Sequence, residues 1–281
     1  MCLIWGTTWL AIKIGLHGLQ PITGVGFRFV LAGLLLYGVA AASGRLRPLR
    51  ELPWRVILVY STMLFGIDYV LTYTAETRLD SGLVAVLFST LPFFNFAFGR
   101  FMIGEHATPR VWLGATIACV GIAVMCLSGQ VRGSPLYALA AIGSAAGSAF
   151  ANVYAKKHSH HDPLVTLPPS MLISGLVLSV AGTMFEATDW HAALAPSSLL
   201  ALAYLAVFGS AGAFFLMMWL LRRIPAWGIG VASTIFPMVA IIVGALFGGE
   251  QFGMRDLAGC VLVLGGVALA LTVSGTSPER T

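Results

Sequence analysis

Residues 88–105 are FSTLPFFNFAFGRFMIGE, and residues 233–250 are STIFPMVAIIVGALFGGE. In each stretch a proline interrupts an apolar run, a glycine follows seven residues later, and a Gly-Glu pair ends the run. Pro92 and Pro237 stand 145 positions apart, and so do Glu105 and Glu250. The same pattern therefore occurs in two apolar segments about half the chain apart, and the predicted fold follows from this repeat.

The composition shows which medium these segments occupy. Of 281 residues, 58% are hydrophobic and 10% are charged, with a mean hydropathy of +0.89, whereas soluble domains carry about a quarter charged residues. Apolar runs of about 20 residues can cross a bilayer core of about 30 Å, and a backbone in lipid must satisfy its own hydrogen bonds as helix. The sequence therefore predicts an all-α integral membrane protein with ten transmembrane helices. We place the spans at about 2–16, 22–42, 54–76, 82–103, 110–128, 134–155, 166–186, 197–221, 227–248 and 255–274.

The basic residues indicate an orientation. With the N-terminus in the cytoplasm, eleven of the sixteen Lys and Arg residues fall on the inside and only Arg78, Arg132 and Arg255 fall outside. The positive-inside rule favours this topology, which puts both termini in the cytoplasm. The same bias accounts for the net charge of +5. A nucleic-acid partner is not expected, because no soluble module carries a basic face.

The repeat extends beyond the two quoted stretches. At the fixed offset of 145, ten residues of 78–123 match residues of 223–268, among them Gly114 with Gly259 and Gly121 with Gly266. Some of the glycine matches are expected by chance in a chain with 32 glycines. Matched proline, arginine and Gly-Glu positions are harder to attribute to chance.

The repeat predicts two units, residues 1–129 and 134–281. Each holds five spans, an odd number, so the second unit should be inverted relative to the first. Inverted repeats with helix breakers near the midplane are typical of secondary transporters, whose substrate site lies between the repeats. A duplication kept for packing alone is the alternative.

The order of several short motifs resembles that of the EamA-type carriers of the drug/metabolite transporter superfamily, and within it the bacterial exporters of amino acids and related metabolites. These motifs are Trp5-Gly6, Lys13, Pro21, Arg28, Ser81-Gly82, Pro92, Gly104-Glu105, Gly114 and Gly121. The resemblance implies a basket-shaped bundle in the bacterial cytoplasmic membrane, with a central cavity lined by spans 1, 3, 4, 6, 8 and 9. The first span has only four residues before Trp5, and we expect the native chain to begin earlier.

Ten residues are candidates for lining a substrate cavity. They are Trp5, Trp9, Lys13, Asp68, Tyr69, Tyr73, Asn95, Asn152, Phe215 and Trp219. Spacings of four place the first three on one face of a helix, and Asp68, Thr72 and Glu76 form a similar polar stripe. The alternatives are that the tryptophans anchor at the membrane interface, that Lys13 extends to the surface, and that the asparagines and aromatic residues pack between helices.

Asp68 is the acid placed deepest within a predicted span. A carboxyl group at that depth should be paired, protonated or exposed to water. One hypothesis makes it the proton carrier of a coupled transporter, and the other pairs it with Arg28 or Lys13. The sequence slightly favours the pair.

Two prolines and two glutamates repeat for reasons that need no substrate. Pro92 and Pro237 should bend the fourth and ninth spans, either as hinges or as a fixed curve. Glu105 and Glu250 each precede another helix, where a carboxylate interacts well with the helix N-terminus. We interpret both glutamates as structural.

Other chemistry is not indicated. The histidines of KKHSHHD lie in a connection, and the four cysteines lack metal-ligand spacing, so we expect no metal and no cofactor. No ATP-binding loop and no serine-hydrolase elbow occurs in the sequence, so an enzyme is not expected. The sequence predicts a monomeric carrier of a small polar metabolite, amino acids above all, in a lipid bilayer. A carrier of drugs, nucleotides or sugar derivatives, and a receptor or scaffold without transport, are the alternatives.

Overall fold

A computed structural model describes residues 1–104, 108–126, 135–158, 162–221 and 226–271, and the side chains at 218–234 lie outside that description. Within these ranges every regular element is a helix, and no strand occurs. The helices are α1 (Cys2–Gly15), α2 (Pro21–Ala42), η1 (Leu49–Glu51), α3 (Trp54–Val59), η2 (Tyr60–Asp68), α4 (Tyr69–Glu76), α5 (Ser81–Phe88), α6 (Leu91–Ile103), α7 (Pro109–Cys126), α9 (Pro135–His158), α10 (Pro163–Phe185), α11 (Trp190–Ala193), α12 (Pro196–Tyr204), η3 (Leu205–Gly212), α13 (Ala213–Leu221), α14 (Ala226–Phe247) and α15 (Met254–Leu271).

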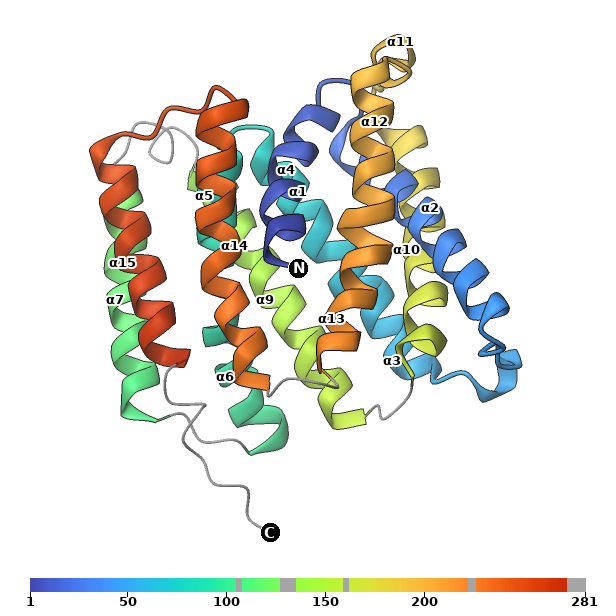
Figure 1. Cartoon of the computed structure of the whole chain (residues 1–281), viewed down its shortest axis with the longest axis horizontal. Coiled ribbons are helices and arrows are strands. Elements are labelled where there is room, and N and C mark those ends of the chain that lie inside the picture. Colours follow the sequence, from blue (N-terminus) through green and yellow to red (C-terminus); the bar gives the residue numbers. More distant parts are fainter. Residues whose placement is uncertain (105–107, 127–134, 159–161, 222–225, 272–281) are drawn as a thin grey trace.

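The apolar runs form helices that lie side by side (Figure 1). Among the described residues, seven helices are long and apolar enough to cross a membrane, and the shorter apolar helices are Cys2–Gly15, Pro109–Met125 and Ile235–Phe247. The helix bounds coincide with the predicted spans to within a few residues, since Ile235–Phe247 is part of α14 (Ala226–Phe247). Differences of three residues occur at the end of α9, which runs to His158 rather than 155, and at the start of α10. α10 begins at Pro163 rather than at 166 because the Asp162 side chain accepts a hydrogen bond from the Leu164 amide and caps the helix there.

Three of the predicted spans are not uniform α-helices. The span at 82–103 breaks at Ser89-Thr90 into α5 and α6, with Pro92 in the first turn of α6. Pro237 lies inside the continuous α14. The spans at 54–76 and 197–221 each contain a π-helical segment, η2 and η3, which begin 145 residues apart at Tyr60 and Leu205. The offset of the sequence repeat therefore recurs in the backbone.

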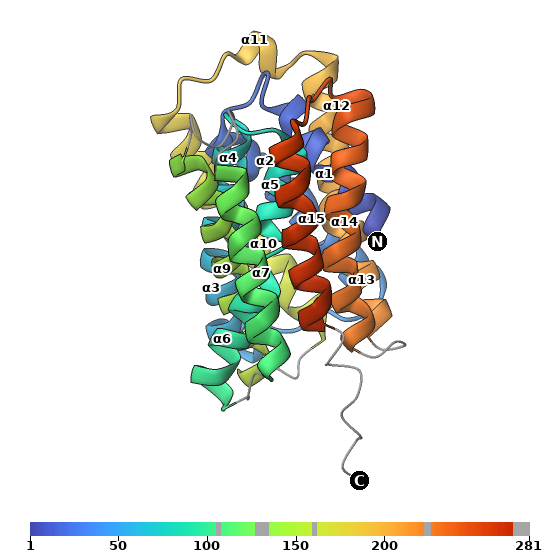
Figure 2. The same cartoon turned by 90° about the vertical axis from the view of Figure 1, so that its left-hand side faces the viewer.

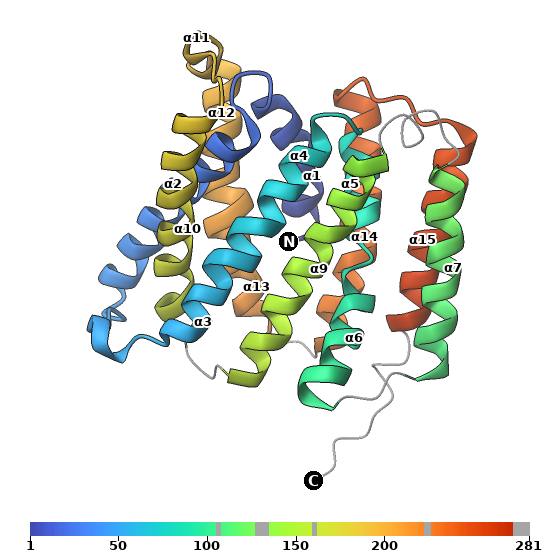
Figure 3. The same ribbon diagram turned by 180° about the vertical axis from the view of Figure 1, so that it is seen from behind.

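Helices from the two predicted units pack against each other throughout the bundle. One side of the molecule is the pair α2 and α10, the other is the pair α7 and α15, and α1, α4, α9 and α14 lie between them (Figures 1 and 3). Figure 2 shows α7 and α15 running beside each other along the near side. α1 packs on α14 and α9 packs on α6, an exchange of contacts of the kind that an inverted repeat predicts.

The glycines matched at offset 145 have direct structural roles. Gly114 faces the Gly266 carbonyl, and Gly121 faces the Gly259 carbonyl at a distance that leaves no room for a side chain. Because no side chain separates them, the backbones of α7 and α15 approach closely at two points. The glycines of the Gly-Glu pairs, Gly104 and Gly249, adopt left-handed φ values of 73° and 65° where α6 and α14 end, a conformation that favours glycine.

Basic side chains gather at one end of the bundle. The lower end in Figures 1 and 3 holds the C-terminal ends of α2, α6 and α9 and the beginnings of α3 and α7. Exposed basic residues at these helix ends and in the segment that joins α2 to α3 are Arg45, Arg47, Arg50, Arg55, Arg100, Arg110, Lys156 and Lys157. At the opposite end, the described basic residues are Lys13 in the last turn of α1, Arg78 and Arg255. The segregation of charge that the sequence predicted is present.

Candidate functional site

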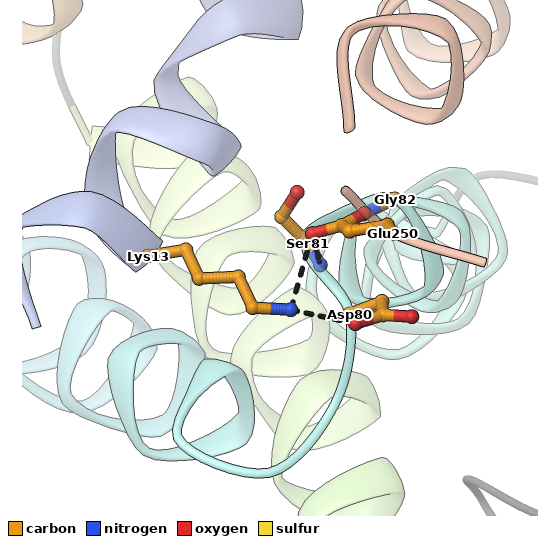
Figure 4. A network of polar contacts seen from close by, with 5 residues as sticks. All are labelled: Lys13, Asp80, Ser81, Gly82 and Glu250. Atoms are coloured by element: carbon orange, nitrogen blue, oxygen red, sulfur yellow. Dashed lines mark hydrogen bonds and ion pairs between the residues drawn. The ribbon is translucent and has the colours of Figure 1, made fainter. Parts of the chain in front are cut away.

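Lys13, near the end of α1, holds two carboxylates at the end of the bundle away from the basic residues. Its Nζ lies 2.6 Å from Asp80 Oδ1 and 3.2 Å from Glu250 Oε1 (Figure 4). Glu250 also accepts hydrogen bonds from the backbone amides of Ser81, at 2.8 Å, and Gly82, at 3.2 Å. We call these five residues the lysine network. It ties α1, the start of α5 and the segment after α14 to one another.

The lysine network corrects the prediction for Glu250. The carboxylate does cap a helix N-terminus, but the helix is α5 and not the next helix in the chain. The next helix, α15, has its own cap, because the Asp256 carboxylate accepts a hydrogen bond from the Gly253 amide at 3.0 Å. Lys13 is bound to acids and does not extend freely to the surface. Glu105 lies outside the described residues.

Arg28 is the most deeply buried basic residue that the structure describes, with 1% of its surface exposed. Its Nε donates to Ser210 Oγ at 2.8 Å, and its terminal nitrogens donate to the Tyr73 hydroxyl at 3.3 Å and to the Gly209 carbonyl at 3.2 Å. The guanidinium carbon lies 4.7 Å from the centre of the Tyr69 ring, a cation–π contact. We call these five residues the arginine cluster.

The arginine cluster joins α2 and α4 to the π-helical segment η3, which supplies Gly209 and Ser210. Segments of this kind are rare and occur frequently at functional sites. Sequence reasoning placed Tyr69 and Tyr73 at the site but did not assign Gly209 or Ser210. Neither residue differs in type from the many small residues of the other spans, so only the structure identifies them.

Asp68 is 3% exposed and lies at the end of η2. Thr72 Oγ1 donates to its carboxyl group at 3.4 Å, and Ser148 of α9 also hydrogen-bonds to it. Among the described residues no ion pair joins Asp68 to Arg28 or Lys13. A direct ion pair is therefore not formed, since Lys13 is engaged by the lysine network and Arg28 by η3 and the tyrosines, although Asp68 and Arg28 do interact electrostatically.

Glu76, at the end of α4, is 2% exposed. Neither of its carboxyl oxygens has a hydrogen-bond partner among the residues that the structure describes. It interacts electrostatically with Glu250, Lys13 and Arg28, and its helix α4 packs on α1, which carries Lys13, and on α2, which carries Arg28. Sequence reasoning had placed Glu76 on the polar stripe of Asp68 and Thr72 but had not named it as a site residue.

Trp5 and Trp9 pack inside the bundle. Trp5 meets the rings of Phe214 and Phe236 edge-on, with centroids 6.1 and 6.4 Å away. Trp9 stacks on Phe236 at 6.2 Å, packs beside Phe88, and is 7% exposed. Interfacial anchoring of Trp9 is therefore not what the structure shows. Its buried Nε1 has no hydrogen-bond partner within the described ranges.

The EamA-like transporter family is matched twice along the sequence, over residues 1–127 and again over residues 135–272. The chain belongs to the EamA-like transporter family. It is similar to the "Uncharacterized inner membrane transporter YedA" of Escherichia coli (strain K12), with 30% identity over 96% of this chain and 87% of that protein. It is also similar to a "Probable amino-acid metabolite efflux pump" of Salmonella typhimurium, with 27% identity over 99% of this chain and 94% of that one.

A crystal structure shares the fold of this EamA-like transporter, with a TM-score of 0.73 and 19% identity over 97% of this chain and 95% of the other. The protein is thus a membrane transporter whose relatives are bacterial and include inner-membrane transporters.

The remaining predicted site residues of this EamA-like transporter do not join the arginine cluster or the lysine network through any contact described in the structure. Asn95 of α6 is half-buried, and its Oδ1 is buried without a partner among the described residues. Asn152 of α9 is exposed, and Phe215 of α13 is 48% exposed. The side chain of Trp219 lies outside the described part of the chain. A role for these four residues stays a prediction, as does a hinge at Pro92 or Pro237.

Proposed function

We propose that this EamA-like transporter exports small polar metabolites, amino acids above all, across the bacterial cytoplasmic membrane by alternating access. The observation that carries the proposal is the arginine cluster together with Glu76. Charged residues of both signs are buried between helices of both predicted units. Ionisable residues inside a membrane bundle are costly and mark substrate or ion pathways. Relatives named as amino-acid metabolite efflux pumps support the substrate class.

The proposal includes two inverted five-helix units, with both termini in the cytoplasm, acting as a monomer. The shared offset of the π-helical segments and the crossed glycine contacts of α7 and α15 support the inverted units. The basic end of the bundle supports the orientation. Substrate access would then alternate between the basic end and the end that the lysine network closes, as one unit rocks against the other.

Counterflow in liposomes tests this function. Purified protein is reconstituted into vesicles preloaded with each of the twenty amino acids in turn, and uptake of the same labelled amino acid is measured without an imposed ion gradient. We expect saturable uptake for a subset of the amino acids. Arg28→Met should abolish it because it removes a buried charge, whereas Arg50→Met, at an exposed side chain, should not.

Other results of this experiment would contradict the proposal in distinct ways. Folded protein that moves no amino acid, but moves a drug, a nucleotide or a sugar derivative, is a carrier of another class. Folded protein that binds solutes without turnover is a receptor or a scaffold.

A further inference from the structure

Arg28 and Glu76 are two buried residues of opposite charge, and no ion pair joins them among the described residues. We propose that they form the two halves of a zwitterion site, in which the Arg28 guanidinium binds the carboxylate of an amino acid and Glu76 binds its ammonium group. This inference rests on the proposed function and names the residues that would select its substrate class.

Arg28 lacks an anionic contact. Its described hydrogen-bond acceptors are a hydroxyl of serine, a hydroxyl of tyrosine and a backbone carbonyl, all of them neutral. Arginine stays charged in proteins and has five N–H donors, of which these contacts use three. A buried guanidinium is ordinarily matched by a carboxylate or a phosphate, which its planar fork binds in two places. Asp68 interacts with Arg28 electrostatically but makes no ion pair with it, so two donors of the guanidinium are left for a ligand.

Glu76 receives no hydrogen bond from the residues that the structure describes. Both carboxyl oxygens are buried and unpartnered among the described residues. The nearest cations belong to other groups, because Lys13 is bound by Asp80 and Glu250 and Arg28 by η3 and Tyr73. A buried carboxyl group without hydrogen bonds costs free energy, so a hydrogen-bond donor supplied by a ligand would stabilise it. An ammonium group supplies up to three donors and a positive charge.

Tyr73 connects the two unfilled positions. Tyr73 accepts a hydrogen bond from Arg28 and stands three residues before Glu76 on α4, a spacing that puts both side chains on one face. Arg28 and Glu76 interact electrostatically, and no ion pair joins them among the described residues. A ligand with a carboxylate and an ammonium group on neighbouring atoms would satisfy both side chains at once. An α-amino acid has that arrangement.

The experiment measures equilibrium binding of analogue sets to purified protein in detergent. The probes are L-leucine, L-phenylalanine and L-threonine, each with its decarboxylated amine and its deaminated acid. We expect the wild type to bind at least one amino acid about tenfold or more tighter than either partial analogue, because each lost charge removes charge-assisted hydrogen bonds. Binding of none of the three amino acids would overturn the inference.

Two variants assign the charges. Glu76→Gln should abolish the preference for the amino acid over its deaminated acid, and Arg28→Gln should abolish the preference over its amine. Glu51→Gln and Arg50→Gln, at exposed side chains, are the matched controls and should keep both preferences. Arg28→Lys keeps the charge and should retain part of the preference over the amine if Arg28→Gln fails to fold.

The selectivity pattern separates this site from a structural role and from the proposed function. Variants that lose affinity for all analogues in equal proportion would make Arg28 and Glu76 structural and overturn the inference. If the protein shows amino-acid counterflow but both variants keep the wild-type binding preferences, the transport function would be supported and this site contradicted. If each variant loses the one preference expected of it but the wild type shows no counterflow, the site would be supported and the transport function contradicted.

Discussion

The Lys13 ammonium group forms ion pairs with two carboxylates that come from distant parts of the chain. The side chain of Glu250 is 1% exposed, whereas those of Lys13 and Asp80 are 29% and 17% exposed. The buried carboxylate therefore depends on Lys13 and on two backbone amides for its stabilisation. A buried acid that loses its cation is left uncompensated, which costs more than an exposed pair ever contributes.

Lys13→Met should lower the free energy of unfolding by about 1.5–3 kcal/mol, the usual cost of losing a hydrogen bond to a charged group. Thermal unfolding in detergent measures it. Arg50→Met is the control, because the pair of Arg50 with Glu51 is long, at 4.0 Å, and exposed, so no change is expected there. Equal midpoints for Lys13→Met and the wild type would show that the amides alone satisfy Glu250.

The sequence indicated these residues unevenly. The helical spacing of Asp68, Thr72 and Glu76 correctly predicted a buried polar stripe, since lipid penalises polar side chains. The partners were not predictable, because they lie far apart in the chain: Glu250 is 169 residues from Ser81, and Ser210 is 182 residues from Arg28. A polar residue's burial can be inferred from its own helix, but its partner depends on the packing of the other helices.

At the scale of elements, α7 and α15 form an interface that depends on backbone contact. Gly114 and Gly121 on one helix meet Gly266 and Gly259 on the other. In a membrane such contacts hold helices together by close packing, since lipid is as apolar as the helices. A methyl group at any of these positions would meet a carbonyl oxygen, which cannot move aside as a flexible side chain can.

Gly266→Ala should destabilise the protein by about 1–3 kcal/mol, the cost of overpacking an interior. The new methyl group would meet the Gly114 carbonyl and the Ala118 backbone. Gly265→Ala, at the preceding residue, is the matched control because nothing lies within 4 Å of its added Cβ. Thermal unfolding of the two variants makes the comparison, and equal midpoints would contradict the described packing.

Polar contacts link α2 and α10 at both ends of the pair. At one end Glu186 accepts hydrogen bonds from the Ile22 and Thr23 amides at 2.9 and 2.7 Å. At the other end Arg45 pairs with Asp162 at 2.8 Å, with side chains 46% and 29% exposed. A carboxylate on a helix N-terminus is worth more than an exposed ion pair.

Glu186→Gln should therefore cost about 1–2 kcal/mol of stability, whereas Arg45→Gln should cost less than about 1 kcal/mol. Chemical or thermal unfolding in one detergent compares them. A larger loss for Arg45→Gln would mean that the ion pair, and not the capped helix, dominates the pairing of these helices.

Helix positions followed from the sequence because apolar length alone decides what can cross a bilayer. The interruptions followed only in part, because a bend near Pro92 was predicted but the π-helical segments were not. The fourth span breaks at Ser89-Thr90, shortly before the proline, and η2 and η3 contain no proline at all. Arg28 of α2 contacts η3 at Gly209 and Ser210, and the pattern of a single span does not contain such a contact.

At the scale of the whole molecule, charge and connectivity predict how the bundle sits in the membrane. The basic end should face the cytoplasm, and the end with the lysine network should face away from it. In a variant without native cysteines, Arg47→Cys should react with a membrane-impermeant maleimide only after spheroplasts are permeabilised. His191→Cys, exposed in α11 at the opposite end, should react without permeabilisation. The reverse labelling pattern would invert the proposed orientation.

The cap that Glu250 places on α5 has a consequence for biosynthesis. The Ser81 amide receives its partner 169 residues later in the chain, which at about 5–20 residues per second is a delay of roughly 10–30 s on the ribosome. For that interval the nascent protein holds a helix end without its cap and a lysine without one of its two acids. Quality-control factors that detect unpaired polar groups in the bilayer have this interval in which to act, and it ends only after Glu250 has been synthesised.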